Sequence, residues 1–175
     1  MKMRAKKNRY GGWKEQTILF LASQSITLFG STVVQMAVIW YATRATSSGR
    51  WVAVFYICSW LPQFFVSFMG GVFADRYDRK KLIIGADTVT ALITFCMAVT
   101  MGMFRQEQDL LAALLIMSLL RSVSAGIQTP AVNAVIPQLV PGEELIHYNG
   151  INAAMQSTVQ FAAPVAAGAV LTGRN

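Results

Sequence analysis

Long stretches without a charged residue recur along the chain, and they constrain its fold more than any other feature. The first runs from Thr17 to Thr43 and the second from Trp51 to Ala74. A membrane-spanning helix needs about 20 apolar residues, whereas a signal-peptide core has only about 7–15. Only 13% of the 175 residues are charged, compared with about 25% in a typical soluble domain. The sequence therefore predicts an all-α, polytopic transmembrane helical bundle.

Two further runs contain one charge each. The run at 82–104 is interrupted by Asp87, and the run at 110–129 contains Arg121. The second of these is expected to end near Thr129, because Pro130 disfavours a helical conformation of the preceding residue.

The stretch 131–140 is too short to span a membrane and is interpreted as an interfacial segment between prolines. Glu143 and Glu144 suit the first turn of a new helix, where the helix dipole favours anions. Five spans are therefore expected, together with a basic tail, a loop and a connector. The tail is 1–15, the spans are 16–43, 51–74, 82–104, 110–129 and 147–172, the loop is 75–81, and the connector is 130–146.

Basic residues near the span ends predict a cytoplasmic N-terminus in a plasma (cell inner) membrane. On this orientation ten basic residues lie inside, namely Lys2, Arg4, Lys6, Lys7, Arg9, Lys14, Arg76, Arg79, Lys80 and Lys81. Four lie outside, namely Arg44, Arg50, Arg105 and Arg174. The connector 130–146 has no lysine or arginine and gives this orientation no support.

Several classes of function are not expected. The net charge of +7 comes from basic residues beside apolar runs, not from a basic face with interleaved aromatics, so nucleic-acid binding is not predicted. Cys58 and Cys96 lie in separate apolar runs, and His147 is isolated in a polar connector, so neither a metal site nor a cofactor is expected. Catalytic motifs and a P-loop are absent from the sequence, which argues against an enzyme or an ATP-driven pump.

Polar residues in three spans recur at helical spacing and therefore share one face of each helix. They are Gln24, Thr27, Ser31 and Gln35 in the first span, Ser118, Arg121, Ser124 and Gln128 in the fourth, and Asn149, Asn152, Gln156 and Gln160 in the fifth. These stripes are expected to line a wet, substrate-binding cavity, although they also suit hydrogen bonds between helices. Arg121 is costly inside a span and marks a candidate functional site, with a structural role toward backbone carbonyls as the alternative.

The segment 71–81 reads GVFADRYDRKK and resembles the signature loop of the major facilitator superfamily, G-x-L-A-D-R-x-G-R-[KR]-[KR], between its second and third helices. Phe73 replaces the usual leucine and Asp78 replaces the second glycine. The resemblance implies that Gly71 allows close helix approach. It also implies that Asp75 and Arg76 form a conformational switch with a helix of the C-terminal half, within a basic set that includes Arg79 and Lys80.

Other segments support the same resemblance. Arg121 and Gly126 look like the family's R-x-x-x-x-G element, which implies a role in proton coupling. The segment with Pro164 and Gly168 is similar to the antiporter motif G-P-x-x-G-G, with Ala163 and Ala167 in place of two glycines. The stretches 128–141 and 21–26 look like those of macrolide and multidrug exporters in this superfamily.

The resemblance implies secondary export of a macrolide or another amphipathic drug in exchange for protons. The alternatives are transport of another solute, such as a sugar, a siderophore or a lysolipid, or a truncated membrane protein without transport activity. Family members have two six-helix halves, so the chain is expected to be an N-terminal fragment that lacks its C-terminal half as a partner and is inactive alone. Asp87 or Asp75 is the candidate proton carrier, unless that group lies in the missing half. For Asp87 the alternative is an ion pair with Lys80 or Lys81.

Overall fold

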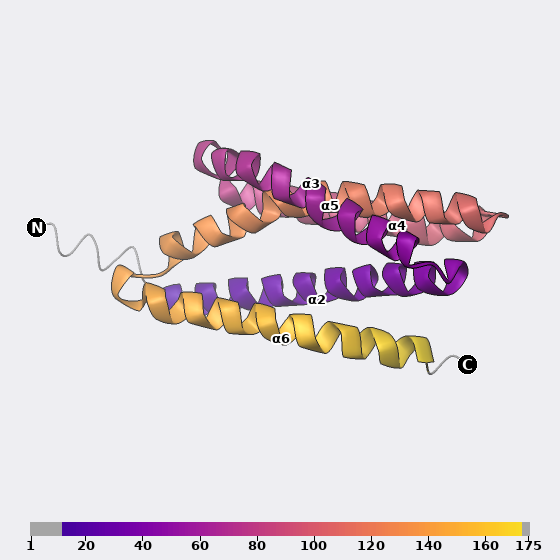
Figure 1. The fold of residues 1–175 in the computed structure, drawn as a ribbon. Coiled ribbons are helices and arrows are strands. Elements are labelled where there is room, and N and C mark those ends of the chain that lie inside the picture. Colours follow the sequence, from indigo (N-terminus) through magenta and orange to yellow (C-terminus); the bar gives the residue numbers. More distant parts are fainter. Residues whose placement is uncertain (1–11, 173–175) are drawn as a thin grey trace, which may run out of the picture. The chain divides into compact units, whose positions relative to one another are not determined.

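The computed structural model describes residues 12–172, which form helices joined by short connectors, with no strand in that range (Figure 1). Five long α-helices follow one another: α2 (Trp13–Thr46), α3 (Gly49–Arg76), α4 (Arg79–Thr100), α5 (Glu107–Leu139) and α6 (Leu145–Thr172). Two short 3₁₀ helices, η1 (Met101–Met103) and η2 (Gly142–Glu144), precede α5 and α6 respectively. The all-α prediction is confirmed. The basic residues of the tail from Lys2 to Arg9 lie outside the described residues, as does Arg174.

Helix α5 continues through Pro130 and Pro137 to Leu139, which corrects the expected helix end at Thr129. The cytoplasmic position of the connector 130–146 stays a prediction. Proline in a helix costs one backbone hydrogen bond and crowds the preceding turn. Here the Pro130 ring packs against α3, where its Cγ would lie 2.8 Å from a Cβ built on Gly70. Because Gly70 has no side chain, it leaves room for the ring, and this packing stabilises the helical conformation at Pro130.

Four of the described helices are long and apolar enough to cross a membrane: Trp13–Thr46, Gly49–Arg76, Arg79–Met103 and Glu107–Leu139. Helix α6 has 28 residues, or about 42 Å at 1.5 Å per residue, so its length also suffices. It is not among these four, because no stretch within it is as apolar as the stretches that mark the other helices. The fifth span therefore stays a prediction, as do the limits of the membrane along each helix.

The chain divides into two compact units. The first comprises the described residues up to Val34 and those from Asn133 onward. In it, the start of α2 runs in the same direction as α6 (Figure 1). Leu21, Ile136, Val140 and Tyr148 form its buried core, and the rings of Trp13 and Tyr148 meet edge to face at 5.3 Å.

The second unit, Gln35–Val132, contains α3, α4 and most of α5. Helices α3 and α5 approach closely at two glycines. A Cβ on Gly70 would lie 2.5 Å from the carbonyl oxygen of Gly126, and a Cβ on Gly126 would lie 2.8 Å from Cβ of Val66. Real Cβ atoms do not come this close, so both positions require glycine for the present packing. Small residues at helix interfaces are typical of membrane bundles, because they let the backbones approach.

Candidate functional site

The segment 71–81 forms a tight junction between α3 and α4, in which only Tyr77 and Asp78 lie between the two helices. The Asp78 carboxylate accepts a hydrogen bond from the backbone N–H of Lys80 at 3.0 Å. Aspartate suits this N-cap position, because the first N–H groups of a helix have no partner within the helix. The expected loop 75–81 is mostly helical. Asp78 caps α4 through its side chain, which glycine lacks.

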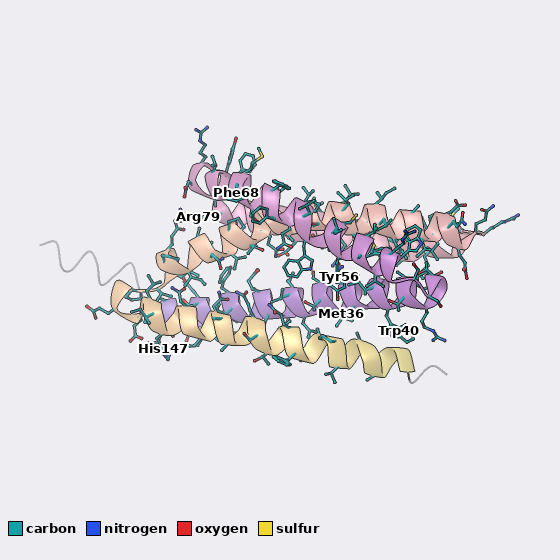
Figure 2. All side chains as sticks on the ribbon, viewed as in Figure 1. Met36, Trp40, Tyr56, Phe68, Arg79 and His147 are labelled. Carbon is teal, nitrogen blue, oxygen red and sulfur yellow. The ribbon has the colours of Figure 1, made fainter. Side chains whose placement is uncertain are left out.

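Arg79 closes the other side of the junction (labelled in Figure 2). Its Nε donates to the carbonyl oxygen of Ala74 at 2.9 Å, and its Nη2 lies 3.7 Å from Oδ1 of Asp75. The last carbonyls of a helix lack partners within it, so Arg79 caps the end of α3. The Asp75 side chain is 80% exposed, and an ion pair so exposed to solvent contributes little to stability. Arg76 and Lys80 are also exposed.

Gly71 makes no close helix approach within the described residues, so the approach that the signature implies for it stays a prediction. A Cβ built there meets no atom within 4 Å, whereas the neighbouring Gly70 is buried against α5. Within the described residues, the glycine that α3 needs for packing is therefore Gly70.

Arg121 lies in the middle of α5 and is only 8% exposed. Its Nη1 donates to the hydroxyl of Thr94 on α4. Burial of a guanidinium is costly unless it is hydrogen-bonded, so Thr94 stabilises the charge there. Sequence reasoning identified Arg121 but missed Thr94.

Asp87 pairs with an amide, not with a loop lysine. Its Oδ1 accepts from Nε2 of Gln128 at 2.6 Å, and within the described residues it forms no ion pair with Lys80 or Lys81. Asp87 and Thr94 are seven residues apart on α4, and Arg121 and Gln128 are seven residues apart on α5. Two antiparallel helices therefore present two polar pairs, about two turns apart. That matched spacing is the sequence signal that would have found Thr94.

The polar stripes differ in burial. On α5, Ser118 and Ser124 are buried and Gln128 is half-buried, whereas on α6, Asn152 and Gln156 are half-buried and Gln160 is exposed. On α2, the half-buried residues are Gln24, Thr27, Ser31 and Gln35. Nε2 of Gln35 donates to the Ser59 hydroxyl on α3 at 2.6 Å, so this residue of the α2 stripe forms a hydrogen bond between helices. A cavity lined by all three stripes stays a prediction.

Residues 14–173 match the family described as transmembrane secretion effector, a major facilitator family. The chain belongs to this family. Its members are transporters, not enzymes, and the chain is accordingly a multi-pass membrane protein in contact with the lipid bilayer.

Curated relatives of this family member include macrolide efflux protein A of Streptococcus pyogenes, with 33% identity over 91% of this chain and 38% of the relative. Macrolide efflux protein A of Enterococcus faecalis is 36% identical over 55% of this chain and 29% of the relative. The staphyloferrin A transporter of Staphylococcus aureus is 22% identical over 70% of this chain and 30% of the relative. The chain thus spans well under half the length of these relatives. No solved structure matches it significantly.

Two further family elements lie on α5 and α6 of this family member. Gly126, five residues after Arg121, packs against α3, so its role within the described residues is helix packing. Pro164 lies inside α6, between Ala163 and Ala167, both of which are buried. Gly168 is exposed, and a Cβ there would meet no atom within 4 Å. The antiporter role of Pro164 and Gly168 stays a prediction.

Proposed function

We propose that this family member acts in the secondary export of macrolides or other amphipathic drugs, in exchange for protons. The similarity to macrolide efflux protein A over 91% of the chain supports this proposal most strongly. Because the chain covers 38% of that relative, the proposal concerns a transporter that contains this sequence as its N-terminal part.

The two polar pairs of α4 and α5, in which Arg121 is buried and the other three residues are half-buried, suit such a role. Charged and polar groups inside membrane spans are rare because they are costly, and they commonly mark substrate or proton pathways. In this proposal Arg121 acts in coupling, Asp87 or Asp75 carries the proton, and the polar stripes contact the substrate.

Replacement of Arg121 by alanine tests the proposal in a transporter that contains this sequence. We expect coupled efflux to be lost while the protein still inserts, because removing a charge from mid-span eases insertion by about 2.5–3.5 kcal/mol on translocon scales. Efflux of a labelled macrolide and the amount of protein in the membrane are measured together. Arg105→Ala is the matched control, since Arg105 is exposed between η1 and α5. Unchanged efflux in Arg121→Ala would reduce Arg121 to a packing role.

A second candidate is transport of another solute such as a siderophore, which the similarity to the staphyloferrin A transporter supports. Measurement of drug accumulation in cells distinguishes the two proposed substrates. Cells that carry the transporter should accumulate less macrolide under the first proposal and an unchanged amount under the second.

A further inference from the structure

The hydroxyl group of Ser122 on α5 enters the backbone hydrogen-bonding pattern of α3. Its Oγ donates to the carbonyl oxygen of Ser59 at 2.5 Å and accepts from the backbone N–H of Gln63 at 2.9 Å. Residues 59 and 63 are four apart, so a regular α-helix would join these same two groups directly. Ser122 is 4% exposed. A side chain of one helix thus bridges one turn of another.

Pro62 explains why this turn of α3 accepts an outside hydroxyl. It lies inside α3 and has no N–H, so the carbonyl of Cys58 lacks its usual donor four residues on. Helices commonly bend at proline or where a side chain inserts into the backbone ladder, and both features meet here. The Ser122 hydroxyl satisfies backbone groups directly beside the step that Pro62 interrupts.

Three residues of α5 at intervals of four face α3. Ser122 bonds to its backbone, a Cβ on Gly126 would lie 3.0 Å from the Gln63 carbonyl oxygen, and Pro130 packs at Gly70. Gly126 and Pro130 make only van der Waals contacts in this set, whereas Ser122 makes two directional bonds. The two bonds of Ser122 therefore restrain rotation of α5 about its axis.

Arg121 is the residue next to Ser122, about 100° away around α5. With Ser122 fixed on α3, the guanidinium of Arg121 faces α4 and donates to Thr94. We propose that Ser122 is a positioning residue for Arg121: its bonds to α3 set the rotation of α5 and so direct Arg121 toward Thr94. The importance of this positioning for transport rests on the export function proposed for Arg121. The positioning itself does not depend on that function.

The test compares Ser122→Ala with Ser124→Ala in the 175-residue chain, in lipid nanodiscs. Ser124 is a matched control because it is also buried on α5, but its hydroxyl donates to the Leu120 carbonyl of its own helix. Two NMR signals are followed. The Gln63 amide reports the bond from α3 to Ser122, and the Thr94 methyl reports the position of Arg121.

Ser122→Ala is expected to move the Gln63 amide proton upfield and to shift the Thr94 methyl, while Ser124→Ala leaves both signals in place. An unmoved Thr94 methyl in Ser122→Ala would overturn the positioning role, even if the Gln63 signal changed. An unmoved Gln63 amide would overturn the backbone bridge itself. Neither measurement uses transport, so failure here is distinct from loss of the proposed export function, which the Arg121→Ala efflux assay tests.

Discussion

Asp87 and Gln128 offer a residue-scale test of proton coupling. Replacement of Asp87 by asparagine keeps an oxygen that accepts from the Gln128 amide but removes the group that titrates. We therefore expect Asp87→Asn to preserve packing of α4 on α5 and to abolish proton-driven efflux in a transporter that contains this sequence. The measurement is drug efflux driven by an imposed pH gradient.

Asp87→Leu is the companion variant, because it removes both the titrating group and the hydrogen bond. If only the leucine variant loses efflux, the carboxylate matters through its bond to Gln128. Full efflux in Asp87→Asn would exclude Asp87 as the essential proton carrier.

The sequence predicts where these charges lie better than what they contact. Arg121 stands out because a charge in a long apolar run is costly. Its partner Thr94 does not stand out, because threonine is common in helices of this kind and its role depends on the register of α4 against α5. The Ser122 bridge to α3 is hidden for the same reason. Periodicity gives the face of a helix, but not the partner to which that face turns.

At the scale of helices, the α3–α5 contact predicts different effects for two adjacent glycines. Gly70→Ala would place a Cβ 2.5 Å from the carbonyl oxygen of Gly126, whereas Gly71→Ala meets no atom within 4 Å. Overpacking typically costs about 1–3 kcal/mol, so we expect Gly70→Ala to destabilise the chain by about that amount. Gly71→Ala should have no destabilising effect, since alanine is the better helix former.

Helicity followed by circular dichroism during denaturation in mixed micelles measures this difference. Equal midpoints for the two variants would show that α3 and α5 can separate without cost at Gly70.

The same contact explains why sequence reasoning misplaced the end of α5. Pro130 is a reasonable helix boundary when only its neighbours in sequence are considered. In the structure it packs at Gly70, sixty residues earlier in the chain. A long-range contact therefore decides a local conformation. By contrast, the number of long helices follows directly from the spacing of charges, which needs no tertiary information.

For the whole molecule, the distribution of basic residues predicts that the α3–α4 junction faces the cytoplasm. Tyr77 in that junction is 62% exposed, so a cysteine there should react with a reagent that reaches its side of the membrane. In a background without Cys58 and Cys96, a membrane-impermeant maleimide applied to intact cells should leave Tyr77→Cys unlabelled. Gln106→Cys, in the exposed connector before α5, should be labelled. The opposite pattern would invert the proposed topology.

The last prediction is that the 175-residue chain does not transport by itself. Alternating access requires two helical bundles that rock around a central site, and the described residues contain five long α-helices, fewer than one six-helix half. Purified chain is reconstituted into liposomes with an imposed pH gradient and a labelled macrolide, and we expect no uptake above that of empty liposomes. Liposomes containing Arg121→Ala control for leak through the helices. Saturable, gradient-dependent uptake that Arg121→Ala removes would contradict this prediction, because it would mean that copies of this chain assemble into a working transporter.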